Sequence, residues 1–132
     1  MPDDSQELNA QIASYFAPDF FETYANQAMY EASAWGLKII FGLLDQSTGE
    51  ARVKKTFAVN IPWPLAKLAT FSLRVQVAAE EAQDGQIVVR AGLIPPEAPA
   101  LNEEQEADPV AKRMYEKYAQ LREEFLRECS QS

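Results

Sequence analysis

The sequence of 132 residues contains no histidine and a single cysteine, Cys129. The lack of histidine removes the commonest general base and the commonest metal ligand of proteins. One cysteine can form neither an intramolecular disulfide, nor a zinc cluster, nor a redox pair of thiols. No histidine is present to activate Cys129 as a nucleophile. We therefore expect no metal, no cofactor and no catalytic residue, and we predict that the protein is not an enzyme.

Glycine is also scarce, and the five glycines are scattered singly along the chain. The sequence has no glycine-rich phosphate loop, no G-x-S-x-G motif and no EF-hand spacing. No apolar run approaches the roughly 20 residues that a membrane span needs. The acidic start Met1-Pro2-Asp3-Asp4 is not typical of a signal peptide. We expect a cytoplasmic protein of bacterial type with no membrane partner.

Positive charge is the third deficit, with 12 lysines and arginines against 20 acidic residues and a net charge of −8. A nucleic-acid-binding protein depends on a basic surface, so this balance argues against such a partner. The charge is uneven, because residues 75–111 hold only one base, Arg90. This acidic segment either keeps the protein soluble as a linker or folds back on the more basic middle of the chain.

What the sequence does contain is alternation of apolar and polar side chains, which predicts strands. We predict a first strand within residues 22–34, a second from Leu37 to Leu44 and a third from Val53 to Ile61. The second is apolar on both faces, as is usual for a central strand. The short apolar segment 86–90 is a candidate for a fourth strand at an edge of the sheet.

The stretch from Asn60 to Gly85 can be read in two ways. Proline at positions 62 and 64 fits a helix start, and apolar residues then recur at spacings of three and four, which favours a helix from Pro64 to Gln83. Phe71 to Val77, however, alternate strictly, as in a half-buried strand. We predict the helix and retain the strand as the alternative.

The two ends of the chain predict further helices. Residues 1–21 suggest a short docking helix that ends before Pro18, and residues 92–108 form a proline-rich acidic linker. Asp108-Pro109 is a helix start for an amphipathic helix over residues 109–132. The expected fold is α+β: residues 22–91 form an antiparallel sheet of three or four strands with a helix packed on one face, and helices lie at both ends.

Seven residues are candidates for a binding surface. Trp35 and Trp63 are either exposed contacts or part of the core, and Lys67 is either a partly desolvated lysine or a lysine at the rim of its helix. The other candidates lie on the polar stripe of the central helix or on the apolar stripe of the last one: Arg74, Tyr118, Leu121, Phe125.

The chain contains four short motifs: Tyr24-x-Asn26, Phe41-Gly42, Pro64-x-Ala66-Lys67 and Gly85 before a short apolar segment. Together they resemble a bacterial family of small proteins whose domain has no known function. This chain departs from the pattern at Asp84, where the family has an aromatic residue, and in its acidic C-terminal extension. The resemblance implies three strands followed by a helix, and the family offers no established activity to carry over. A weaker likeness is to export chaperones of the SecB type, which Leu73 to Val77 resemble if they form a strand.

These features lead to one main hypothesis and two alternatives. A small sheet with two apolar faces cannot be covered by one helix, so we expect a second copy to cover it. The main hypothesis is a non-catalytic homodimeric binding or adaptor protein whose C-terminal helix contacts the second copy or another protein. The first alternative is a SecB-like chaperone that binds extended apolar segments. The second is a small enzyme that uses Lys67 and carboxylates.

Overall fold

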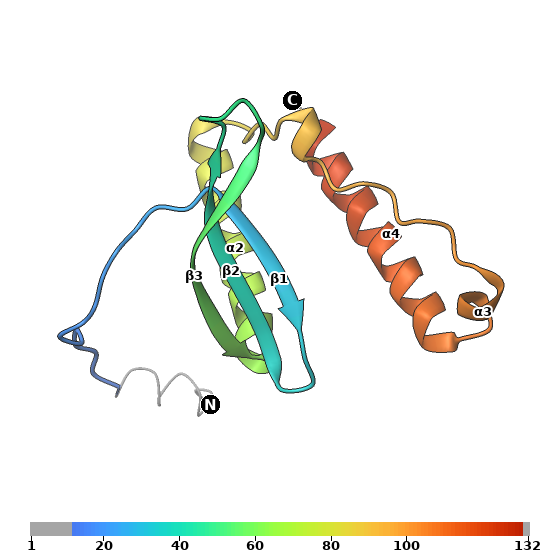
Figure 1. Cartoon of the computed structure of the whole chain (residues 1–132), viewed down its shortest axis with the longest axis horizontal. Coiled ribbons are helices and arrows are strands. Elements are labelled where there is room, and N and C mark those ends of the chain that lie inside the picture. The colour runs from blue at the N-terminus through green and yellow to red at the C-terminus, as the bar shows by residue number, and fades with distance from the viewer. Residues whose placement is uncertain (1–11, 131–132) are drawn as a thin grey trace. The chain divides into compact units, whose positions relative to one another are not determined.

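The computed structural model describes residues 12–130 and confirms the α+β fold, with a three-stranded antiparallel sheet and helices (Figure 1). The chain divides into two compact units, Met1–Ala66 and Lys67–Ser132. The division falls inside the stretch 22–91 that we predicted as one core domain. The sheet belongs to the first unit, and most of the helical residues belong to the second.

The sheet consists of β1 (Gln27–Ala32), β2 (Gly36–Asp45) and β3 (Arg52–Pro62), in the order β1-β2-β3. The prediction that the strand with two apolar faces is central is therefore confirmed. The possible fourth strand at 86–90 does not form, because these residues have no regular secondary structure. The expected N-terminal helix lies largely outside the described residues, and the part from residue 12 onward is not helical.

One face of the sheet carries a small aromatic cluster. The rings of Phe41 and Phe57, which are paired across β2 and β3, stack with their centroids 4.9 Å apart. Phe21, from the segment before β1, meets Phe57 edge to face at 6.2 Å. Such pairs contribute about 0.5–1.5 kcal/mol beyond the area that they bury. The cluster thus connects β2, β3 and the segment before β1 on this face of the sheet.

Two glycines allow β2 and β3 to approach closely. A Cβ on Gly36 would lie 2.3 Å from the carbonyl oxygen of Ile61, and a Cβ on Gly42 would lie 2.6 Å from that of Lys54. Beside Gly42 the register shifts by one residue, and the hydroxyl of Thr56 donates to the Phe41 carbonyl at this bulge, 3.2 Å away. Here β-bulge and glycine together set the local bend of the strand pair.

The stretch with two readings is a helix. α2 runs from Trp63 to Asp84 without a break and includes Phe71–Val77, so the strand alternative is wrong. The helix follows β3 directly, with Pro64 in its first turn, where a missing N–H costs nothing. It ends at Gly85, whose φ of 89° only glycine adopts easily and whose N–H donates to the Glu81 carbonyl at 3.0 Å. Its packing on one face of the sheet stays a prediction.

The second unit continues with the short 3-10 helix η1 (Ala91–Leu93), α3 (Glu103–Glu106) and α4 (Pro109–Ser130). The predicted cap of the last helix is confirmed, since the Val110 N–H donates to the Asp108 carboxylate at 2.9 Å. Asn102 and Gln105 form a capping box around α3.

The proline-rich linker is fastened to α4, where we expected it to be solvated. Arg122 donates through Nε to the Pro95 carbonyl at 2.8 Å, and the Tyr118 hydroxyl donates to the Pro96 carbonyl at 2.6 Å. Consecutive prolines lack N–H groups and keep the segment out of helices and strands, so its carbonyls are free to accept from side chains. The linker thereby covers part of α4 in the same chain.

The C-terminal end of α4 also contacts α2. The Arg74 guanidinium lies 3.7 Å from the Glu128 carboxylate, and the side-chain amide of Gln86 donates to the Glu128 carbonyl. Leu73, Val77 and Phe125 line the hollow beside this ion pair. Arg74 and Phe125, two of the predicted binding residues, are thus engaged within one chain.

The residues that the structure describes form no buried apolar core. Among residues 12–129 no hydrophobic side chain is buried, and Gly42 is the one buried residue. Large exposed hydrophobic side chains lie on each strand and on both long helices: Tyr30, Leu44, Val59, Leu68, Phe71, Leu73, Val110, Met114. None of the helices in the described part of the chain has the length and hydrophobicity of a membrane span.

Candidate binding surfaces

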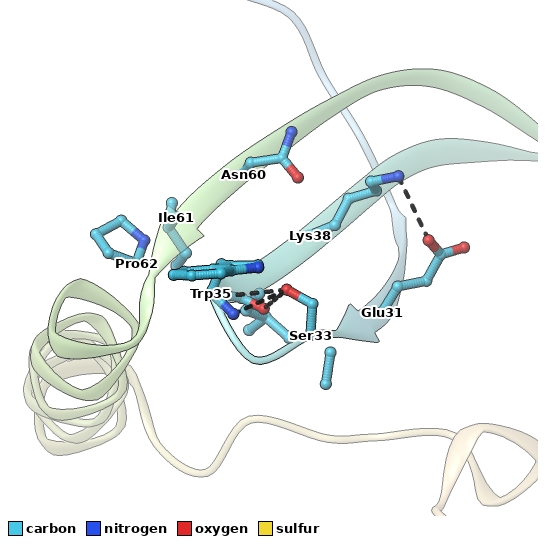
Figure 2. Close-up of a pocket in the computed structure, with 10 residues that line it drawn as sticks. Glu31, Ser33, Trp35, Lys38, Asn60, Ile61 and Pro62 are labelled. Atoms are coloured by element: carbon cyan, nitrogen blue, oxygen red, sulfur yellow. Dashed lines mark hydrogen bonds and ion pairs between the residues drawn. The ribbon is translucent and has the colours of Figure 1, made fainter.

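A hollow of about 450 Å³ lies at the end of the sheet where the β1–β2 turn meets the end of β3 (Figure 2). Its apolar side is made by Trp35, Ile61 and Pro62, and its polar side by Glu31 and Lys38. All of its lining residues belong to the first unit. It is therefore a feature of the sheet itself.

The turn that frames this hollow is held by Ser33. Its Oγ accepts from the backbone N–H groups of Trp35 and Gly36, each at 3.2 Å, and donates to the Gly36 carbonyl at 3.1 Å. Serine side chains often replace backbone bonds in this way in tight turns. The Ser33 N–H donates to the Gly36 carbonyl as well, at 2.9 Å. Trp35 is consequently displayed on a well-bonded turn.

The two tryptophans have different roles. The indole N–H of Trp63 donates to the Ser33 carbonyl at 2.9 Å, which fixes the first residue of α2 to the β1–β2 turn. Its side chain is 41% exposed, whereas Trp35 is 90% exposed. Trp35 therefore fits the predicted role of an exposed aromatic contact. Trp63 is a structural residue within the first unit.

The polar side of the hollow is one row across the sheet. Glu31 pairs with Lys38 on β2, which pairs with Asn60 on β3. The Lys38 ammonium lies 3.5 Å from the Glu31 carboxylate, and both side chains are largely exposed. Exposed ion pairs of this kind contribute between 0 and about 1 kcal/mol. The row can offer hydrogen bonds and charge of both signs to a bound peptide, but it has no nucleophile beside a base.

The remaining predicted site residues are not brought to this hollow. Lys67, Arg74, Tyr118, Leu121 and Phe125 all belong to the second unit. Lys67 is exposed on α2, as expected for a lysine at a helix rim. Within residues 12–130 no three carboxylate or thiol side chains gather in an arrangement that could hold a metal ion.

Sequence reasoning missed the polar members of the hollow, which are Glu31, Ser33, Lys38 and Asn60. The signal for Glu31 and Lys38 was available, because two oppositely charged residues flank the predicted turn at matching distances. Asn60 lies in β3, just before the prolines that predict the helix start. Its position opposite Lys38 depends on the register of a strand pair, and that register is shifted by the bulge at Thr56.

The motif residues serve the fold. The Asn26 side chain accepts from the Leu44 N–H at 2.9 Å, and Gly42 and Gly85 meet the backbone requirements described above. Asn26 thus closes the open end of the β1–β2 pair. These three motif residues therefore have structural roles.

The pKa of Asp45, the last residue of β2, is lowered by the turn that follows it. The Ser47 hydroxyl donates to the Asp45 carboxylate at 2.7 Å and the Ser47 N–H donates at 2.9 Å, and these bonds keep the pKa of Asp45 below its ordinary 3.8. Because the folded pKa is lowered, the loop bonds are intact above pH 3.8 and are lost as the pH falls through the folded pKa.

Substitution of Ser47 by alanine is expected to raise the pKa of Asp45 toward 3.8, because the largest cause of the lowering is the serine hydroxyl. The backbone N–H remains, so part of the lowering persists. An NMR titration of the Asp45 carboxyl carbon measures the change. Ser47→Thr keeps the hydroxyl and should keep the low pKa; an unchanged pKa in Ser47→Ala contradicts the assignment.

No protein family, no curated protein and no solved structure was found to match this chain. The candidate surfaces are therefore judged on their geometry and chemistry alone.

Proposed function

We propose that the protein is a non-catalytic binding or adaptor module that acts as a homo-oligomer through protein–protein contacts. The observation that carries this proposal is the lack of any buried hydrophobic side chain among residues 12–129. Ordering the backbone costs about 1–2 kcal/mol per residue, and burial of apolar side chains is the main term that offsets it. The described residues leave many large hydrophobic side chains exposed, so their burial by association stabilises the folded chain further.

The sheet provides the surface for such contacts. Apolar side chains occupy both faces of β2, and Tyr30 on β1 and Val59 on β3 are 66% and 41% exposed. Exposed apolar patches of this extent mark interaction sites in proteins. The second unit offers a further stripe on α4, where Val110, Met114 and Leu121 are all exposed.

A second candidate function is favoured by the same exposure. A chaperone of the SecB type would keep apolar surfaces open in its native state to receive extended segments of unfolded proteins. The helical state of Phe71–Val77 removes the strand on which the likeness to those chaperones was based. Exposure of apolar side chains is thus the one remaining support for this alternative.

Light scattering on the full chain over a range of concentrations tests the proposal. We expect a mass of twice the 14.8 kDa of one chain or a larger multiple, and little binding of a hydrophobic dye, because the apolar faces are covered. A native oligomer that binds the dye strongly and keeps an unfolded client protein from aggregating would favour the chaperone. A monomer at every concentration would overturn self-association.

A further inference from the structure

We propose that the outer edge of β3 pairs with β3 of a second copy, antiparallel about a two-fold axis at Val59, to form one continuous six-stranded sheet. This inference rests on the proposed self-association and names its interface. It follows from the direction of the backbone groups, the charges along β3 and the side chains that would meet.

The hydrogen-bond pattern shows which backbone groups of β3 are unused. The bond from the Ser33 N–H to the Gly36 carbonyl sets the alternation, so that even-numbered residues of β2 from Gly36 to Gly42 bond to β1 and odd-numbered ones bond to β3. The partners of the odd-numbered residues are Ile61, Val59 and Phe57. The residues between them, Ala58 and Asn60, therefore point their N–H and C=O groups away from the sheet.

Within the described residues these outward groups have no partner of their own. The first residue of α2 does not cover them, because the Trp63 indole is bonded to the β1–β2 turn on the other side of β2. An open edge of this kind is a template for another strand.

The charges along β3 leave its middle unprotected. Natural edge strands are usually guarded by charged residues or proline. In β3 the protecting residues lie only at the two ends, Lys54 and Lys55 at one end and Pro62 at the other. Residues 56–61 between them are uncharged. The opposite edge, β1, is shorter at 6 residues and carries Glu31. The edge that invites a partner is therefore β3.

A second copy fits this edge because β3 is self-complementary about Val59. In that register Ala58 pairs with the second copy's Asn60, and each such pair exchanges both backbone hydrogen bonds. Phe57 comes opposite the second copy's Ile61, and the two Val59 side chains meet, so apolar residues face each other on one side of the sheet. The aromatic cluster around Phe57 thereby becomes continuous across the junction.

The charges also agree with pairing between identical strands. In the same register the basic end of one strand, with Lys54 and Lys55, meets the uncharged end of the other, which finishes at Pro62. No lysine therefore lies opposite another lysine. An unrelated strand would need an uncharged end opposite the lysines of β3. A second copy has such an end by symmetry.

Ala58→Pro tests the edge without changing the bonds inside the sheet. Proline removes the outward N–H of residue 58 and is tolerated at an edge. We expect the mass to fall to that of one chain at concentrations where the unchanged protein is a dimer, with the far-ultraviolet circular dichroism retained. Ala28→Pro makes the same change at an outward position of β1 and should leave the dimer intact.

A cross-link tests the register and remains informative if Ala58→Pro does not fold. Residues opposite each other in a non-hydrogen-bonded pair have Cα atoms about 4.5 Å apart, which a disulfide can span. In a Cys129→Ser background, Val59→Cys is expected to form a covalent dimer on mild oxidation. Tyr30→Cys, on the same face at the other edge, should stay monomeric in a denaturing gel.

The outcomes separate this inference from the proposed function. An unchanged protein that is dimeric, with Ala58→Pro also folded and dimeric or Val59→Cys not cross-linked, overturns pairing through β3 and leaves self-association standing. A monomeric unchanged protein overturns both. If that monomer binds an unfolded client protein and Ala58→Pro does not, the edge takes a foreign strand in place of a second copy.

Discussion

Gly36→Ala and Gly42→Ala are each expected to lower the free energy of unfolding by about 3 kcal/mol or more, a loss at the upper end of the range for overpacking. The added Cβ would lie 2.3 Å and 2.6 Å from backbone carbonyl oxygens of β3, which cannot move aside as a flexible side chain would. The two strands must therefore separate locally and lose ladder hydrogen bonds. Urea unfolding followed by circular dichroism measures the loss.

Gly92→Ala is the matched control for these two substitutions. Gly92 has nothing within 4 Å of its Cβ position and no positive φ, so alanine there should be neutral or slightly stabilising. Gly49→Ala is a second comparison, in which space is free but the φ of 82° is unfavourable, with an expected loss of about 1 kcal/mol. A loss under 1 kcal/mol for Gly42→Ala would contradict the close approach of β2 and β3.

The strands could be predicted because their signals are local. Alternation over residues 37–44 and 53–61 reports which side chains share a face, and a run that is apolar on both faces reports a central position. The structure adds what alternation does not contain. The bulge at Thr56 shifts the register, and this shift determines that Asn60 stands opposite Lys38.

The region after β3 shows where local signals conflict. Phe71–Val77 alternate like a strand, yet they lie in the middle of a helix of 22 residues. Once the first turn of a helix has formed after the proline start, each further residue adds one backbone hydrogen bond, so the helix extends through this segment. The segment 86–90 has a strand-like composition but no neighbouring strand. Its Ile87 N–H donates instead to the Glu81 carboxylate at 3.0 Å, which ties it to the end of α2.

The candidate surfaces depend on contacts between residues far apart in the chain, and these could not be predicted. The sequence treats Trp35 and Trp63 alike, since each stands beside a glycine or a proline. The bond from Trp63 to Ser33 spans 30 residues, and it alone distinguishes the anchored ring from the free one. The bonds from Arg122 and Tyr118 to the proline-rich linker also join residues far apart in the chain. They hold the linker against α4, where the sequence predicted a solvated spacer.

Trp63→Ala is expected to lower the free energy of unfolding by about 2 kcal/mol, because it removes a half-buried ring and the hydrogen bond to the Ser33 carbonyl. Trp35→Ala removes the same atoms from a side chain that is 90% exposed and should change stability by less than about 0.5 kcal/mol. Urea unfolding followed by circular dichroism compares the two without relying on tryptophan fluorescence. Trp63→Phe keeps most of the ring and should lose about 1 kcal/mol, the share of the hydrogen bond.

The same pair of substitutions separates a binding residue from a structural one. If Trp35 is a contact for a peptide or protein partner, Trp35→Ala weakens binding while its unfolding curve overlays that of the unchanged protein. Trp63→Ala weakens binding only in proportion to its loss of folded protein. An equally large loss of stability in Trp35→Ala would mean that its ring is already covered in the native oligomer. The hollow at the end of the sheet would then belong to an interface between copies. It adjoins the proposed β3 junction, because Asn60 and Ile61 line the hollow and also lie in the paired segment 57–61.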